Sequence, residues 1–175
     1  ERQGVRRVYA ACPNCARELG ELVEVRPIWS VLATQVRRED ISGGIPAVTI
    51  HDPCPMRNQP EELAAARTLL ALAGAAITEP KHSGRRTVCC GNIQMLRARD
   101  PERSSALRTG RIGEFPPDRP VTSCCEGCLD AFRDEGLATV HLLEVLFGKS
   151  GGRGWGNRLA FTRLAHKAQK EVDYD

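Results

Sequence analysis

The arrangement of the cysteine residues constrains this chain more than any other feature of its sequence. The chain has 175 residues and eight cysteines. The cysteines fall into four tight groups: Cys12 and Cys15; Cys54; Cys89 and Cys90; Cys124, Cys125 and Cys128. Secreted disulfide scaffolds are normally shorter and rich in loops, and we find no export signal here. We therefore expect a cytoplasmic protein whose cysteines bind metal or take part in redox chemistry.

Charge and hydropathy exclude two classes of partner. Lys and Arg total 25 against 22 Asp and Glu, so the net charge is only +3. The densest basic group runs from Arg97 to Arg111, but Asp100 and Glu102 lie within it, and we interpret it as a solvated face. Nucleic-acid binders usually present a concentrated basic surface. No apolar run approaches the ~20 residues that span a bilayer. We predict no nucleic-acid partner and no membrane span, and leave association with a membrane complex open.

Short apolar runs alternate with helical segments along the chain. We expect strands at residues 8–11, 23–25, 47–50, 76–78, 121–123 and 139–140. We expect helices at residues 16–22, 27–36, 60–73, 129–134 and 141–147, and partly at 92–111. Pro27 is placed at a helix start because proline suits the first helical turn. This alternation predicts an α/β fold with a small, mainly parallel sheet flanked by helices.

Two segments of the chain look alike. Residues 8–32 and 121–146 each predict a strand, a Cys-x-x-Cys motif, a helix, a second strand and an amphipathic helix. We therefore predict three parts. Residues 1–40 are the C-terminal remnant of a first repeat. Residues 45–148 are one complete cysteine-rich domain, and residues 149–175 are a glycine-rich hinge and a terminal helix.

Five cysteines of the complete unit form a candidate metal site: Cys54, Cys89, Cys90, Cys125 and Cys128. We expect a short strand before each cysteine group, because ligands gather where parallel strands end. Helix N-termini there favour the thiolate, which is the form that binds metal. Thiolates select iron–sulfur clusters, zinc or Cu(I). Five thiolates exceed the four ligands of a closed zinc site, and ferredoxin spacing is absent, so we favour a multi-iron centre of another type.

The motifs Cys54, Cys89-Cys90-Gly91 and Cys125-x-x-Cys128 resemble the CCG cysteine-rich domain. His51-Asp52-Pro53-Cys54 and residues 141–147 are also similar to this family. The domain occurs in the catalytic subunit of heterodisulfide reductase and in subunits of glycerol-3-phosphate and glycolate oxidoreductases. The resemblance implies a noncubane [4Fe–4S] cluster on the five cysteines. Relatives usually carry two repeats, whose clusters face each other across a bound disulfide, so we expect this chain to be a C-terminal portion.

The same resemblance implies an oxidoreductase subunit that carries electrons to or from a disulfide, a quinone or a partner oxidoreductase. The partners it implies are other redox subunits, either ferredoxin-like proteins or flavoproteins. Some repeats of the domain hold Zn²⁺ instead, so a zinc-binding structural or assembly module is the alternative. The sequence departs from its relatives after Gly91, where residues 92–95 replace the usual Glu and Gly. We expect a different loop geometry there.

Four further residues near these motifs have candidate roles. His51 is a candidate catalytic residue that donates a proton or a hydrogen bond to cluster sulfur, with a structural turn role equally open. Cys12 and Cys15 are interpreted as a second metal half-site; a zinc pair, a redox-active dithiol and an inert turn remain alternatives. Cys124 is interpreted as a bystander because Ala11 occupies the aligned position in the first repeat.

Overall fold

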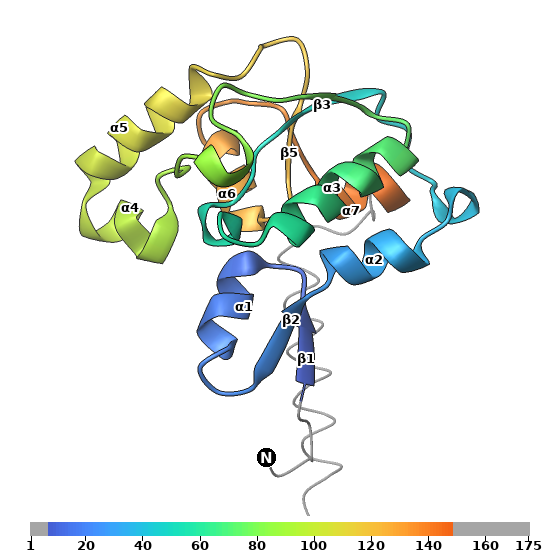
Figure 1. Ribbon diagram of the computed structural model, residues 1–175. Helices are drawn as coiled ribbons and strands as arrows, with labels where there is room; N and C mark the ends of the chain where they lie inside the picture. The colour runs from blue at the N-terminus through green and yellow to red at the C-terminus, as the bar shows by residue number, and fades with distance from the viewer. Residues whose placement is uncertain (1–6, 149–175) are drawn as a thin grey trace, which may run out of the picture.

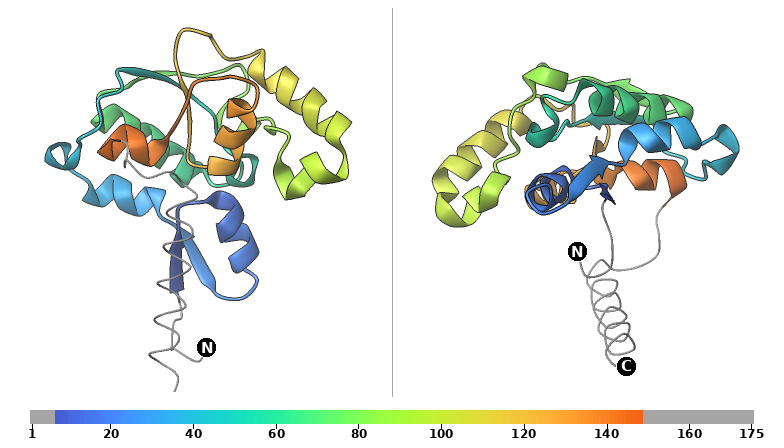
Figure 2. Two further views of the ribbon diagram at one scale, coloured as in Figure 1. Left: turned by 180° about the vertical axis from the view of Figure 1, so that it is seen from behind. Right: turned by 60° about the horizontal axis from the view of Figure 1, so that its bottom comes forward.

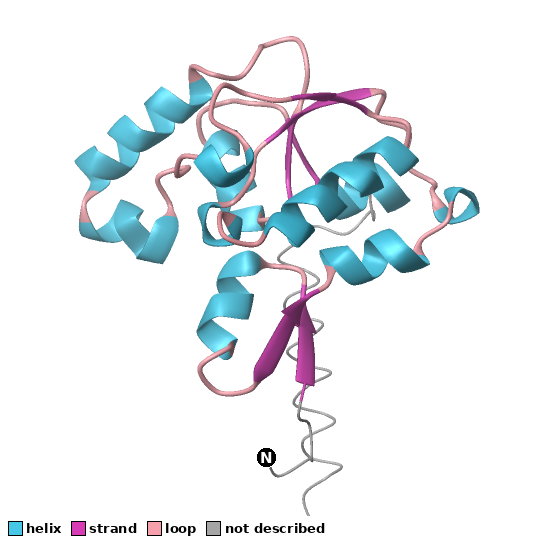
Figure 3. Cartoon of the chain, viewed as in Figure 1, coloured by secondary structure: helices cyan, strands magenta, loops and turns pink. Residues whose placement is uncertain are grey.

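The computed structural model describes residues 7–148 (Figure 1). The expected glycine-rich hinge and terminal helix at residues 149–175 lie outside the described residues. The described part contains a four-stranded parallel sheet with helices around it and a two-stranded parallel sheet near the start of the chain (Figure 3). The prediction of an α/β fold with small parallel sheets flanked by helices is confirmed.

The larger sheet has the strand order β4-β3-β5-β6. Its strands are β3 (Ala47–Ile50), β4 (Ala76–Thr78), β5 (Val121–Ser123) and β6 (Thr139–His141). The central strands β3 and β5 are joined in register at Thr49 and Val121. All three residues of β5 and the last three of β3 are buried. Both faces of the sheet are therefore covered, as is usual for parallel sheets.

The helices of the larger unit lie on two sides of this sheet (Figures 1 and 2). One side carries α3 (Pro60–Leu72) and α7 (Leu142–Phe147). The other carries α4 (Leu96–Arg99), α5 (Pro101–Ile112) and α6 (Glu126–Arg133). Four single-turn 3₁₀ helices lie in the loops: η1 (Arg38–Asp40), η2 (Cys54–Met56), η3 (Gly84–Arg86) and η4 (Ile93–Met95). A large core lies under α3 and α7, and a smaller one contains Phe115, Phe132 and three of the cysteines.

An N-terminal unit precedes the larger one and projects from it in Figure 1. It consists of β1 (Arg7–Ala10), α1 (Pro13–Leu19), β2 (Glu24–Pro27) and α2 (Trp29–Gln35). Strands β1 and β2 pair in parallel and form their own two-stranded sheet. The order strand, helix, strand, helix is the same as in β5, α6, β6 and α7.

Helix α2 connects the N-terminal unit to the larger core. The Trp29 side chain is completely buried in that core, and its Nε1–H donates to the carbonyl oxygen of Ala11 at 3.0 Å. The buried Glu62 of α3 accepts hydrogen bonds from the Ser30 amide at 3.1 Å and the Ser30 hydroxyl at 2.5 Å. These contacts fix α1 and its two cysteines relative to the larger sheet.

Two predictions of local structure are wrong. Pro27 does not begin a helix; it ends β2 opposite Ala10, and the helix begins at Trp29. A proline at a strand end leaves no ladder hydrogen bond unmade. No strand precedes Cys89 in the described structure, because residues 87–88 pair with no strand of the sheet. The Thr87 hydroxyl instead donates to the carbonyl oxygen of Asp52, in the linker after β3, at 2.7 Å.

The interpretation of the arginine group as a solvated face is wrong for two of its members. Arg111 is 0% exposed and Arg108 is 7% exposed. Together with Ser104 they form the buried side of α5. Residues three and four apart share one face of a helix, so these three side chains point the same way. Arg108 pairs with Glu135 at 2.8 Å, and Arg111 reaches the cysteine region described below.

Candidate metal centre

The β3 and β5 strand ends position three of the five predicted ligands. Cys54 begins the 3₁₀ turn that follows β3, after the linker His51-Asp52-Pro53. Cys125 is the N-cap of α6, two residues after the end of β5, and Cys128 lies in the first turn of that helix. Because β3 and β5 are adjacent and parallel, both loops emerge at the same edge of the sheet.

A tight turn positions the other two predicted ligands. Gly91 follows Cys90 with φ +85°, in the left-handed region that favours glycine. A Cβ at this position would lie 2.3 Å from the carbonyl oxygen of Ser104, so no larger residue fits. The Ser104 hydroxyl donates to the Gly91 carbonyl at 2.7 Å, and the Gly91 amide donates to Cys89 Sγ at 3.3 Å. The turn is therefore held against α5.

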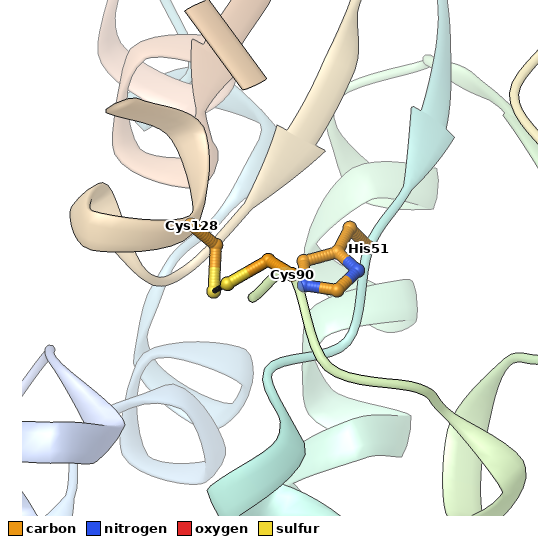
Figure 4. Close-up of side chains that lie close together, drawn as sticks. All are labelled: His51, Cys90 and Cys128. Carbon is orange, nitrogen blue, oxygen red and sulfur yellow. Dashed lines mark hydrogen bonds between the residues drawn. The ribbon is translucent and has the colours of Figure 1, made fainter. Parts of the chain in front are cut away.

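The five thiols form a continuous row. Cys90 Sγ lies 3.2 Å from Cys128 Sγ (Figure 4). Hydrogen bonds between side chains also join Cys54 to Cys89, Cys89 to Cys90, and Cys125 to Cys128. All five cysteines are free, and three of them are buried. Residues from two strand ends and one separate loop thus converge on one place.

A sixth thiol reaches the same row from the N-terminal unit. Cys12, the N-cap of α1, is hydrogen-bonded to Cys125 and to Cys15. Asn14 of the same helix lies 3.5 Å from Cys125 Sγ through its side-chain amide, which donates to the sulfur. Cys15 itself is exposed. The first Cys-x-x-Cys motif therefore lies beside the second, and the half-site prediction for Cys12 and Cys15 stays a prediction.

Comparison with known protein families matches residues 48–133 to the CCG cysteine-rich domain. This stretch contains all five cysteines of the row. Residues 48–133 are a CCG cysteine-rich domain. No curated protein and no solved structure gives a significant match to the chain. The family and the clustered cysteine and histidine side chains are consistent with a metal-binding module of redox type. Within residues 7–148, no helix is both long and apolar enough to cross a membrane.

The hydrogen bonds between the cysteines lower the pKa of some thiols and raise the pKa of others. The pKa of Cys89 is lowered to about 2 by its hydrogen bonds from Cys54 and Cys90. The pKa of Cys125 is lowered to about 2 by those from Cys12 and Cys128. The neighbours that donate, Cys54 and Cys12, have raised pKa values for the same reason and because they are partly buried. Because metal binds the thiolate, metal binding would release the protons that these cysteines still hold.

His51 lies beside this row in the CCG domain. Its side chain is 1% exposed and packs edge-on against Phe132, with the ring centroids 4.9 Å apart. Its ligand atom and those of Cys90 and Cys128 all lie within 4.8 Å of one another. Figure 4 shows the ring on the side of the two sulfur atoms. The role of His51 as a donor to cluster sulfur stays a prediction.

Sequence reasoning missed two polar residues of the CCG domain and its surroundings. Arg111 donates from Nε to His51 Nδ1 at 3.0 Å. Asn14 lies in the N-terminal unit, outside the five-cysteine pattern, and contacts Cys125. Neither has a motif of its own. The only available signal for Arg111 was its helical spacing from Ser104 and Arg108, which places all three on one side of α5.

Asp52 and Cys124 have structural contacts. The Asp52 carboxylate accepts from Arg67 Nη1 at 2.9 Å and Nη2 at 2.8 Å, and from the Gly84 amide at 2.6 Å. It therefore fixes the turn before Cys54. Cys124 is buried in the other core, with its sulfur 3.2 Å from Met56 Sδ. It points away from the row of five thiols, which is consistent with a bystander.

An open cavity of about 600 Å³ adjoins the cysteine row. Asn14 and Asn92 line both this cavity and the smaller one that contains Cys54, Cys90 and Cys128. The remaining lining residues are Arg17, Glu18, Gln94, Met95 and Arg99. Gln94 and Met95 have φ values of +48° and +57°, so the loop after Gly91 is strained.

Proposed function

We propose that this protein is an iron–sulfur redox protein resembling the catalytic subunit of heterodisulfide reductase. In this proposal Cys54, Cys89, Cys90, Cys125 and Cys128 hold a noncubane [4Fe–4S] cluster. The continuous row of five sulfur atoms is the observation that carries it. A structural zinc ion takes four ligands, whereas five soft donors at one place suit a cluster with several metal ions.

The surroundings of the row fit such a cluster. Phe115 and Phe132 pack against three of the cysteines in one core, which keeps water away from the sulfur atoms. The Gly91 amide and the Asn14 side chain donate hydrogen bonds to Cys89 and Cys125. Hydrogen bonds to sulfur and exclusion of water are the means by which proteins set cluster potentials. When bound, the cluster supplies one-electron transfer.

The cavity beside the row suggests where electrons enter or leave. It is open to solvent, it is partly lined by Arg17 and Arg99, and it shares Asn14 and Asn92 with the cysteine site. A disulfide or quinone acceptor, or the redox group of a partner, would approach the cluster from this side. The proposed partners are ferredoxin-like or flavoprotein subunits of a cytoplasmic complex. The Asn14 and Asn92 amides would then orient the acceptor against the sulfur row.

Metal analysis tests this proposal. The protein is purified without oxygen, and iron, acid-labile sulfide and zinc are counted per chain. We expect close to four irons and matching sulfide, with visible sulfur-to-iron absorption. One zinc with no iron and no sulfide would overturn the proposal and favour the structural zinc module. Single serine substitutions at each of the five cysteines should lower the iron content, whereas Cys124→Ser should leave it unchanged.

A further inference from the structure

Arg111 is completely buried and makes defined hydrogen bonds around His51. Its Nε–H donates to His51 Nδ1 at 3.0 Å. Its Nη1 donates to the carbonyl oxygen of His82 at 2.7 Å and to Glu114 Oε2 at 2.9 Å. The guanidinium also lies over the Phe115 ring, 4.8 Å from its centroid. These contacts hold the arginine from several sides, so its Nε–H has one fixed direction.

This geometry determines the tautomer of His51. A guanidinium has only N–H donors, so His51 Nδ1 must act as the acceptor in the bond from Arg111. The hydrogen of the neutral ring is then on Nε2. A second proton on Nδ1 would face the Arg111 N–H and its positive charge. The bond from Arg111 therefore keeps the ring neutral.

The Nε2–H of His51 has no hydrogen-bond partner within the described part of the chain, although it is buried. Figure 4 shows that ring nitrogen on the side of the Cys90 and Cys128 sulfur atoms. Two roles fit this position, as a metal ligand or as a donor to sulfur. A histidine that binds metal normally donates its other ring N–H to an acceptor. Arg111 offers a donor there instead, so His51 is a donor and not a ligand.

We propose that Arg111 is a positioning residue that holds His51 as a hydrogen-bond donor, through Nε2–H, to sulfur on the Cys90–Cys128 side of the metal centre. The inference rests on the proposed iron–sulfur function and deepens it. A hydrogen bond to sulfur stabilises the more negative, reduced state of a cluster. The pair therefore raises the reduction potential of the centre.

Redox titration of four variants tests the proposal. His51→Leu removes the donor, and we expect a reduction potential more negative than that of the wild type. Arg111→Lys removes the Nε–H bond, and we expect a shift in the same direction. His51→Gln keeps an amide N–H near the position of Nε2 and should restore most of the wild-type potential. Arg108→Lys, a change in the neighbouring arginine of the same helix, is the control and should cause no shift.

The ¹⁵N NMR chemical shifts of the His51 ring in the purified, metal-loaded wild-type protein report its tautomer directly, without any variant. We expect the Nε2–H form with Nδ1 as acceptor. A ring protonated on Nδ1, or a metal-bound Nε2, would overturn the proposal. So would unchanged potentials in both His51→Leu and Arg111→Lys with full iron content. If the protein holds zinc and no iron, the proposed function fails, and the tautomer still decides whether Arg111 positions His51.

Discussion

The two Cys-x-x-Cys motifs occupy the same local positions in different surroundings. Cys12 and Cys125 are each the N-cap of a helix, and Cys15 and Cys128 are each its third residue. Cys125 is 1% exposed and Cys128 is 4% exposed. Cys12 is only half-buried, and Cys15 is exposed. The difference comes from what surrounds each helix and not from the motif itself.

The surroundings differ in their strands and in their cysteines. Helix α6 follows a central strand, β5, and lies beside the turn that carries Cys90. Helix α1 belongs to a sheet of two strands, and the only cysteines in the described residues of its unit are Cys12 and Cys15. A Cys-x-x-Cys motif therefore sets the spacing of two thiols on a helix, while neighbouring loops decide whether those thiols join a larger donor set.

The largest contrast should appear when the matched helix positions are exchanged for serine. Cys128→Ser removes a buried thiol from the middle of the row, and we expect loss of most bound metal. Cys15→Ser changes an exposed thiol at the same helical position and should leave the metal content near that of the wild type. Counting iron, sulfide and zinc per chain in both variants checks this. Equal losses in the two proteins would show that the motifs contribute alike.

The double variant Cys12→Ser with Cys15→Ser distinguishes a redox-active dithiol from a metal centre that Cys12 shares with Cys125. If these two thiols act as a redox dithiol, the double variant loses disulfide-reducing activity but keeps its metal. If Cys12 belongs to the same centre as Cys125, the absorption or electron paramagnetic resonance spectrum of the bound metal changes instead. The contact between Cys12 and Cys125 leads us to expect the spectral change.

The next largest effect concerns the attachment of the N-terminal unit. Trp29→Ala removes a completely buried side chain at the junction, and the free energy of unfolding should fall by about 3–5 kcal/mol. Trp29→Phe keeps a ring but loses the hydrogen bond to Ala11, which should cost about 1–3 kcal/mol. Urea unfolding followed by circular dichroism measures both. A negligible change in Trp29→Ala would mean that α2 does not hold the two units together.

Much of the fold and the choice of the five candidate ligands followed from local sequence patterns. Strands β3 and β5 coincide with the predicted 47–50 and 121–123, because short apolar runs ending in cysteine motifs are a local signal. The role of Arg111 was not predictable, because its partners His51 and Glu114 come from a distant strand end and the turn after its own helix. In the sequence alone, a buried arginine cannot be distinguished from a solvated one, because its burial depends on partners that only the folded chain brings together.

The contact between the two motifs was also beyond sequence reasoning. The internal repeat predicted that the first unit has the same order of elements as the second. It did not predict that α1 lies against the row of thiols, because that depends on how α2 docks through Trp29 and Ser30. Such docking is determined by tertiary packing. An internal sequence repeat predicts the order of elements but not how two units pack together.

Gly91 should show a smaller effect that distinguishes the CCG turn from ordinary glycines. Gly91→Ala places a Cβ 2.3 Å from a backbone oxygen in a left-handed conformation, which should cost about 1–3 kcal/mol and lower the metal content. Gly110→Ala, in the last turn of α5 with open space around it, should stabilise the protein by about 0.5–1 kcal/mol. Thermal unfolding and metal counts on both variants test this. A Gly91→Ala protein with normal metal content and stability would contradict the close approach to Ser104.

The smallest expected effect lies at the Ser30–Glu62 contact, which joins α2 to α3. Ser30→Ala removes the hydroxyl donor but keeps the backbone amide that also binds Glu62, so stability should fall by about 1 kcal/mol. Thr34→Ala on the same helix removes an exposed hydroxyl bonded only to the nearby Val31 carbonyl, and should cost less. Urea unfolding of the two variants compares them directly. If Ser30→Ala also changes the spectrum of the bound metal, the position of α1, and with it that of Cys12 beside Cys125, depends on this single contact.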